Sequence, residues 1–171
     1  MPRRGRRGTE TGRFGLRDGQ VPKENILGPL GKGLRVALTV LDFGRTTFGA
    51  CCTGAAQTCL NLAVQHANTR VQFNKTLGNF DLVKKKIARM AADLYAMQAM
   101  TAVTASLIDR GLEDYMIETA MLKGFTTDRL WHAVIDAFQI HGGSAYFNGF
   151  PPARLLRGAR VHPSGRGGHL G

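Results

Sequence analysis

Residues 34–62 read LRVALTVLDFGRTTFGACCTGAAQTCLNL, and this stretch decides the fold class. Apolar residues return at every third or fourth position, which is the period of one face of an α-helix. These residues are Leu34, Leu38, Leu41, Phe48, Cys52, Ala55, Cys59 and Leu62. One position of the series carries a charge, Arg45. Gly44, Gly49 and Gly54 weaken the helix by up to about 1 kcal/mol each relative to alanine, and they allow a bend or the close approach of a neighbouring helix.

Two later segments show the same helical period. The first runs from about Asn79 to Arg110, and Asn79 or Asp81 is able to cap its start. Its expected inward-facing positions are Val83, Ile87, Met90, Leu94 and Met97. The second segment runs from about Glu113 to Ile140. Its expected inward-facing positions are Ile117, Met121, Phe125, Trp131, Val134, Ile135 and Phe138.

A short fourth helix is expected from Pro152 to Arg160, because proline is favoured at the start of a helix. The sequence has no strand pattern of any length, except for a short stretch around Phe14–Val21. Three long amphipathic helices and a short one, joined by short loops, predict an all-α protein with the architecture of an up-down helical bundle. In such a bundle the loops and the helix ends are the places to look for chemistry.

The net charge of +11 is concentrated at the two ends of the chain. Residues 1–20 contain six arginines and two acidic residues, and residues 154–171 contain four arginines and no acidic residue. These Gly/Arg-rich ends lack the apolar content needed to fold, so we expect both basic ends to be disordered. Arginine-rich ends can bind nucleic acid through phosphates, but no aromatic residues are interleaved in MPRRGRRG, and we expect no nucleic-acid partner.

No apolar run approaches the roughly 20 residues of a membrane span, and no apolar stretch follows the first arginines as in a secretory signal. We therefore expect a soluble, cytoplasmic protein without a membrane partner. Cys51, Cys52 and Cys59 lack the spacing of a zinc site and lie within the apolar helical stretch. We expect all three in the core and expect no metal site.

Three groups of residues can carry chemistry. In the first, Asp42 and Arg45 share one helix face through their i,i+3 spacing. They form either an intrahelical ion pair at the edge of the apolar face or a polar spot beside a ligand. The second group is Arg70, Gln72 and Phe73 in the stretch NTRVQFNK, followed by Phe80. It is either a loop with an anchoring phenylalanine or a clamp for a flat anion, since guanidinium suits phosphate oxygens.

The third group is QIHGG, residues 139–143, at the end of the third long helix. Gly142 and Gly143 are either a helix stop signal or a place where backbone approaches a phosphate or ribose, with Gln139 supplying an amide. His141 has no metal-ligand partner at a fixed spacing, so we expect a structural role for it.

Taken together and in order, these residues resemble the C-terminal half of acyl-CoA dehydrogenases. The resemblance runs from near Phe14 through Arg160 and rests on VPKENILG, GKG, DFGR, TRVQFNKTL with FDLVKKKIARMAADLY, and QIHGGSAYF with PPARLLRGAR. It implies a basic tail at residues 1–20, in which FGLRDGQVP is similar to the end of the family's middle β-domain. Residues 21–161 would form the C-terminal helical bundle, and residues 162–171 a divergent tail. The chain would then be a fragment of a longer protein.

The resemblance also implies ligands for the three groups. It places Arg70, Gln72, Phe73 and Phe80 against the FAD of a neighbouring subunit. It places Gln139, Gly142 and Gly143 at the diphosphate and adenosine part of the same FAD. It places Asp42 and Arg45 along the acyl-CoA. The expected partners are acyl-CoA and either a second copy of the chain or a full-length homologue.

The reaction that the resemblance implies is the FAD-dependent α,β-dehydrogenation of an acyl-CoA, of the fatty-acid oxidation type. A carboxylate removes the α proton while a hydride leaves the β carbon. The family position of this base falls on Arg166, and a second position used by some relatives falls on Gly44. Arginine cannot act as a base near neutral pH because its pKa exceeds about 12. We therefore assign no catalytic residue and expect no activity from the chain alone.

Two alternatives remain open on the sequence. The first is a binding or oligomerisation module without catalytic activity, derived from the same family. The second is a basic nucleic-acid-associated protein, whose affinity would depend on residues 1–17 and fall steeply with salt.

Overall fold

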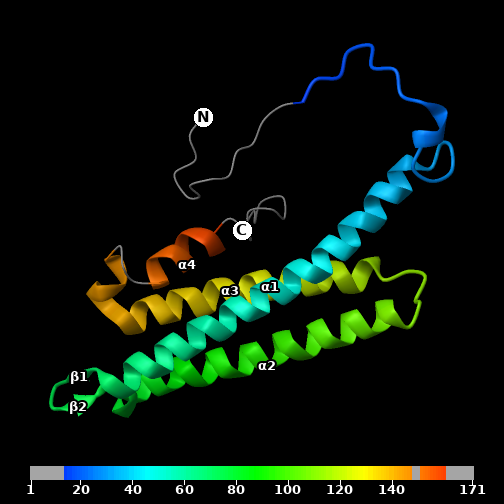
Figure 1. The fold of residues 1–171 in the computed structure, drawn as a ribbon. Helices are drawn as coiled ribbons and strands as arrows, with labels where there is room; N and C mark the ends of the chain where they lie inside the picture. The colour runs from blue at the N-terminus through cyan, green and yellow to red at the C-terminus, as the bar shows by residue number, and fades with distance from the viewer. Residues whose placement is uncertain (1–13, 148–150, 161–171) are drawn as a thin grey trace, which may run out of the picture.

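The computed structural model describes residues 14–147 and 151–160. The predicted all-α bundle is confirmed (Figure 1). The α-helices are α1 (Gly33–Thr69), α2 (Asp81–Asp109), α3 (Met116–His141) and α4 (Pro151–Ala159). Three short 3-10 helices lie between or before them, η1 (Lys23–Asn25), η2 (Leu77–Asn79) and η3 (Gly142–Tyr146). A hairpin of two short strands, β1 (Val71–Gln72) and β2 (Lys75–Thr76), follows α1.

The helices α1 and α3 run in the same direction. The helix α2, which lies between them in the sequence, runs in the opposite direction (Figure 1). Two contacts fix this arrangement. Thr119 near the start of α3 donates a hydrogen bond to Asp42 in the first third of α1, and His141 at the end of α3 stacks on His66 near the end of α1. The short α4 lies against the second half of α3, where the guanidinium of Arg160 sits 5.0 Å from the ring centre of Trp131.

The core depends on a row of small residues along α1. These residues are Gly49, Cys52, Ala56, Cys59, Ala63 and Ala67, and all of them are buried. Their spacing of three or four keeps them on one face of the helix. Small side chains let a neighbouring backbone approach closely, so larger residues of the other helices, such as Met97 and Leu130, fill the space.

Gly49 marks the tightest point of this row. A Cβ at this position would lie 2.8 Å from Cγ of Leu122 and 2.9 Å from its Cδ2. Leu122 of α3 is fully buried, so a shift of its side chain would disturb the core. Of the two roles that the sequence left open for these glycines, Gly49 therefore has the close approach of a neighbouring helix. The helix α1 continues through Gly44, Gly49 and Gly54 without interruption.

The predicted apolar face is wrong at the beginning of two helices. Leu34, Leu38 and Leu41 are 75%, 42% and 54% exposed, because this end of α1 extends beyond the other helices (Figure 1). On α3, Ile117 and Met121 are 69% and 61% exposed, and Ile135 in the second half of the helix, also expected to face inward, is 40% exposed. The positions that turn inward at the start of α3 are Thr119 and Leu122, since threonine can bury its methyl group while its hydroxyl bonds to the backbone of the preceding turn.

Two smaller expectations also differ from the structure. Phe14–Val21 forms no strand, and the only strands among the described residues are those of the hairpin after α1. Asn79 and Asp81 do not cap α2: Phe80 occupies the N-cap position and no side chain bonds to the helix end. The amide of Asn79 instead donates to the hydroxyl of Thr76.

The cysteines are in the core at two of the three expected positions. Burial raises the pKa of Cys52 to about 11 and that of Cys59 to about 12, so both remain thiols at neutral pH. Cys51 is exposed, because it lies one residue away from the buried face of α1. The expected disorder of residues 162–171 and of the first residues of the chain lies outside the described residues.

One buried carboxylate joins α2 to α3. Asp136 is 3% exposed and accepts hydrogen bonds of 2.5 Å from Nζ of Lys86 and from Nη2 of Arg89. Burial by itself raises the pKa of Asp136, but the two cationic donors outweigh it and hold the pKa below its ordinary value of 3.8. In the basic run of residues 84–86, Lys84 and Lys85 are exposed, whereas Lys86 belongs to this network.

The close approach at Gly49 generates a first prediction. We expect Gly49→Ala to lower the free energy of unfolding by about 1–3 kcal/mol, because overpacking against Leu122 exceeds the gain in helix propensity. Gly54→Ala is the matched control on the same helix, since a Cβ there would meet nothing within 4 Å. We expect Gly54→Ala to raise the free energy of unfolding, measured by urea denaturation, by up to about 1 kcal/mol. Equal effects of the two substitutions would contradict the packing described for Gly49.

The buried carboxylate generates a second prediction. We expect Asp136→Asn to lower the free energy of unfolding at neutral pH by about 1–3 kcal/mol, since two charge-assisted hydrogen bonds are weakened. Because the pKa of Asp136 is depressed in the folded state, its contribution is complete above the ordinary value of 3.8 and is lost as the pH falls through the folded value. The difference between the variant and the parent should therefore shrink in acid. Asp109→Asn, at an exposed position, should change stability by less than about 0.5 kcal/mol.

Candidate functional site

The hairpin after α1 presents an aromatic side chain in a strained backbone conformation. Val71 pairs with Thr76 and Gln72 with Lys75, so Phe73 and Asn74 form the two-residue turn. Both turn residues have positive φ, 51° for Phe73 and 64° for Asn74. The left-handed conformation costs a residue with a Cβ roughly 1–2 kcal/mol, and asparagine tolerates it better than phenylalanine. Phe73 is 86% exposed, so no burial of its ring compensates for this strain within the described residues.

The four predicted residues of this segment lie together. Arg70 is the C-cap of α1, and its backbone N–H donates to the carbonyl of His66 at 2.9 Å. The rings of Phe73 and Phe80 meet edge to face, with their centres 6.3 Å apart. Nζ of Lys75 lies 4.2 Å from the ring centre of Phe80. The side chains of Arg70 and Gln72 are exposed, so this end of the bundle offers a cationic and aromatic surface.

The predicted group on α3 lies at the same end of the bundle. Gln139 is exposed in the last turn of α3, and Gly142 follows the helix with φ +59°. A Cβ at Gly142 or Gly143 would meet nothing within 4 Å, so the backbone here is open to an approaching group. The stacked rings of His66 and His141 hold the ends of α1 and α3 side by side. The structure therefore brings the second and third predicted groups together.

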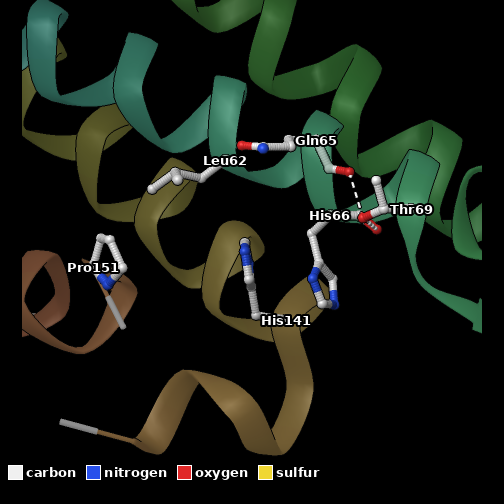
Figure 2. A pocket seen from close by; sticks show the side chains of 6 residues that line it. All are labelled: Leu62, Gln65, His66, Thr69, His141 and Pro151. Atoms are coloured by element: carbon white, nitrogen blue, oxygen red, sulfur yellow. Dashed lines mark hydrogen bonds between the residues drawn. The ribbon is translucent and has the colours of Figure 1, made fainter. Parts of the chain in front are cut away.

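A pocket of about 230 Å³ opens between these helix ends (Figure 2). Its lining residues are Leu62, Gln65, His66, Thr69, His141 and Pro151. The two imidazole rings have centres 4.4 Å apart and an interplanar angle of 23°. Burial, then the charges of His141 and Arg70, lower the pKa of His66 below its ordinary value of 6.5. His141 has the expected structural role, since its Nδ1 lies 2.7 Å from the carbonyl oxygen of Ala137.

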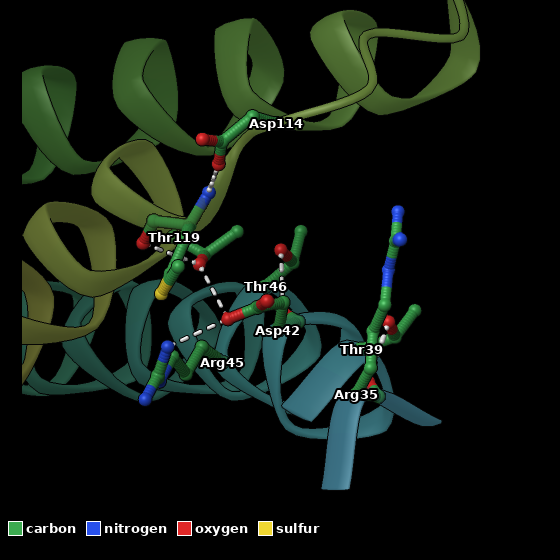
Figure 3. A network of polar contacts seen from close by, with 8 residues as sticks. Arg35, Thr39, Asp42, Arg45, Thr46, Asp114 and Thr119 are labelled. Atoms are coloured by element: carbon green, nitrogen blue, oxygen red, sulfur yellow. Dashed lines mark hydrogen bonds and ion pairs between the residues drawn. The ribbon is translucent and has the colours of Figure 1, made fainter. Parts of the chain in front are cut away.

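The first predicted group forms a polar network in α1 (Figure 3). Nη1 of Arg45 donates to Oδ1 of Asp42 at 2.6 Å, which is the intrahelical ion pair that the spacing allowed. The hydroxyl of Thr119 on α3 donates to the same oxygen at 3.3 Å. Asp42 is 8% exposed, so the ion pair shields this carboxylate from water.

The acyl-CoA candidates lie far from the flavin candidates. Arg45 and Arg70 are separated by 25 residues of one helix, which corresponds to about 37 Å along its axis. Within one chain these two groups cannot line a single pocket.

The sequence did not reveal His66 or Thr119 as site residues. Each lies on a helix face that reads as ordinary packing, and each becomes notable only through a partner on another helix, His141 for one and Asp42 for the other. One feature of the sequence could have pointed to this contact. His66 and His141 each lie in the last turn of a helix, directly before a group of candidate site residues.

Two further findings bear on the chemistry. Gly44, one of the two expected positions of a catalytic base, lies exposed on α1, and the other, Arg166, lies outside the described residues. Among residues 14–147 and 151–160 no three potential metal ligands come together, and no helix has both the length and the apolar character of a membrane span.

Comparison with protein families identifies the domain. The model described as "Acyl-CoA dehydrogenase, C-terminal domain" matches residues 31–169. The mitochondrial isobutyryl-CoA dehydrogenase of Dictyostelium discoideum is 37% identical over 145 residues, which are 85% of this chain and 35% of that protein. This chain therefore spans about a third of the length of that relative.

Solved structures agree with this match. The butyryl-CoA dehydrogenase of Megasphaera elsdenii superposes with a TM-score of 0.80 at 33% identity, over 83% of this chain and 37% of that one. An acyl-CoA dehydrogenase of Bacillus anthracis, solved in complex with FAD, superposes with a TM-score of 0.79 at 32% identity, over 86% of this chain and 28% of that one. The chain belongs to the acyl-CoA dehydrogenase family, and its described helices form the C-terminal domain of that family.

Proposed function

We propose that this domain serves an FAD-dependent acyl-CoA dehydrogenase, in which it holds the adenosine and diphosphate half of the flavin cofactor. The observation that carries the proposal is the convergence of two segments at one end of the bundle. One segment presents Arg70 and the strained, exposed ring of Phe73. The other presents the open backbone of Gly142 and Gly143.

The residues present fit the chemistry of a dinucleotide. A guanidinium pairs with phosphate oxygens through a fork of donors, which suits Arg70. Glycine backbone without a side chain lets a phosphate approach closely, which suits Gly142 and Gly143. The N–H of Gly142 already donates to the carbonyls of Phe138 and Gln139, so the N–H of Gly143 is the candidate donor to the phosphate. The rings of Phe73 and Phe80 offer apolar surface to a flat base, and the exposed amides of Gln72 and Gln139 can bond to its polar edge or to a ribose.

The ligand of this surface belongs to a neighbouring subunit in our proposal. The flavin surface and the Asp42–Arg45 pair lie about 37 Å apart along α1, so this chain does not bring them into one pocket. Asp42 and Arg45 would lie along the acyl-CoA of their own subunit, where the 31% exposed side chain of Arg45 can reach a polar group of the ligand. The partner that completes the site is a second copy or a full-length homologue.

The dehydrogenation requires a hydride acceptor, which FAD supplies, and a carboxylate that removes the α proton of the thioester. We do not assign Asp42 as this base: it is 8% exposed, and its Oδ1 accepts hydrogen bonds from Arg45 and Thr119. Gly44 has no titratable group, and Arg166 remains protonated at neutral pH. We therefore propose that this chain contributes binding groups and no base.

The missing base also supports a second candidate function. A domain of this family that binds a flavin or a subunit without a catalytic carboxylate would act as a binding or oligomerisation module. The two functions differ in one respect that can be measured, because only the enzyme gains turnover when a carboxylate is restored.

A third prediction tests the flavin surface. We consider a chimera that joins the N-terminal and middle domains of a relative to this chain, because the chain alone should retain little or no flavin. In the chimera, Arg70→Ala should weaken FAD binding by about 10- to 100-fold, the loss of one charge-assisted phosphate contact. Arg110→Ala, an exposed arginine after α2, is the matched control and should leave FAD binding unchanged. Equal FAD affinity in the chimera and in Arg70→Ala, measured by fluorescence titration, would refute the assignment.

A fourth prediction tests the position of the base. In the same chimera, Arg166→Glu should raise acyl-CoA-dependent reduction of an electron acceptor by about 100- to 10,000-fold, the usual contribution of a general base. The parent chimera and Arg166→Glu are compared in otherwise identical samples with matched FAD content. Equal activity in the two would show that the base lies elsewhere.

A further inference from the structure

The contact between His66 and His141 lies directly beside both halves of the proposed flavin surface. Arg70 is one helical turn after His66, and its backbone N–H bonds to the His66 carbonyl. Gly142 follows His141 immediately and is the C-cap of α3. A change in the distance between the two imidazole rings would therefore move Arg70 relative to the glycine backbone.

One ring of the pair is held in place by its own helix. Nδ1 of His141 lies 2.7 Å from the carbonyl oxygen of Ala137, so in the neutral ring this nitrogen carries the proton and donates it. His141 is 7% exposed and cannot turn away without breaking into the core. His66, which is half-buried, packs its ring against this fixed surface (Figure 2).

The surroundings of His66 disfavour positive charge. Burial, together with the charges of His141 from α3 and Arg70 from α1, lowers the pKa of His66. The other described residues that line the pocket, Leu62, Gln65, Thr69 and Pro151, carry no charge. None of the described residues that line the pocket is a carboxylate, so a positive charge on His66 meets no counter-charge there and is repelled by Arg70.

We propose that His66 and His141 are positioning residues of the flavin surface, whose stacked rings keep the ends of α1 and α3 together at neutral pH and let them separate in acid. This inference rests on the proposed function for its consequence, which is a pH-dependent affinity for the adenosine and diphosphate half of FAD. The stacking itself is a property of the chain and can be tested without a ligand.

The direction of the pH effect follows from the pKa of His66. Burial and the neighbouring charges lower this pKa in the folded state, so the closed helix ends bind fewer protons than the open ones. The closed form is then favoured most at a pH above 6.5, the ordinary pKa of histidine. This preference is lost as the pH falls from 6.5 through the lower pKa that His66 has in the folded state.

The fifth prediction follows the helix ends by amide hydrogen exchange of the full chain. Between about pH 7.5 and pH 5, the range in which histidine titrates, the opening equilibrium of residues 66–70 and 139–143 should rise several-fold after correction for intrinsic exchange. Amides around Cys59 and Met97, in the middle of the bundle, should not change. Opening that does not depend on pH, or that affects the whole chain equally, would overturn the proposal.

Two variants separate the charge of the pair from its shape. His66→Phe keeps a ring against His141 but cannot be protonated, so its helix ends should stay closed at both pH values. His132→Gln removes an exposed histidine of α3 and should open in acid as the parent does. If His66→Phe opens in acid to the same extent as the parent, the imidazole of His66 is not responsible and the proposal is wrong.

The same variant links the pair to flavin binding. In the chimera described above, the affinity for FAD should fall several-fold from about pH 7.5 to pH 5 in the parent and remain nearly constant in His66→Phe. A failure of Arg70→Ala to weaken FAD binding would refute the flavin surface and leave the exchange result intact. Acid opening of the helix ends with no change in FAD affinity would refute the positioning role alone.

Discussion

The close approach of α1 to α3 is the constraint on which the rest of the structure depends. A row of small residues on α1 provides it, and Gly49 is the point at which no side chain fits against Leu122. Because the two helices run in the same direction, this approach places both of their C-terminal ends at one end of the bundle. The hairpin with Arg70 and the open backbone at Gly142 thus become neighbours, although about 70 residues separate them in the sequence.

Polar groups reinforce the same arrangement at three levels along the bundle. Asp42 and Thr119 join α1 to α3 near the start of both helices, and His66 and His141 join them at the end. Asp136 joins α3 to α2 through Lys86 and Arg89. Each of these three groups has a partner on another helix, which favours one register of the helices over its neighbours. The geometry of the site at the end of the bundle therefore depends on contacts that lie elsewhere along the helices.

The helical period was sufficient to predict the existence and order of the helices, because burial of one face determines that period. It was insufficient to predict which face is buried at an end. Leu34 and Ile117 read as inward positions and are exposed. Leu34 lies where α1 extends beyond the other helices, and at the start of α3 Thr119 and Leu122 turn inward instead. The hairpin at Val71–Thr76 was missed because its strands contain only two residues each and no alternation can be recognised in so short a segment.

The candidate site was predictable in its residue types and in its two segments, since arginine, aromatic residues and paired glycines each have a chemical reason to occur near a phosphate. The proximity of the segments could not be predicted from periodicity, because it depends on the parallel packing of α1 and α3. The role of His66 depends on the ring of His141, and such a contact between distant residues leaves no local pattern in the sequence.

The central claim is that the ends of α1 and α3 form one surface for the diphosphate of a flavin held by a neighbouring subunit. A crystal structure of the chimera with FAD tests it most directly. The account predicts phosphate oxygens within hydrogen-bonding distance of the guanidinium of Arg70 and of the backbone N–H of Gly143, with the rest of the flavin in the adjacent subunit. A diphosphate bound away from both segments, with Arg70 directed into solvent, would contradict it.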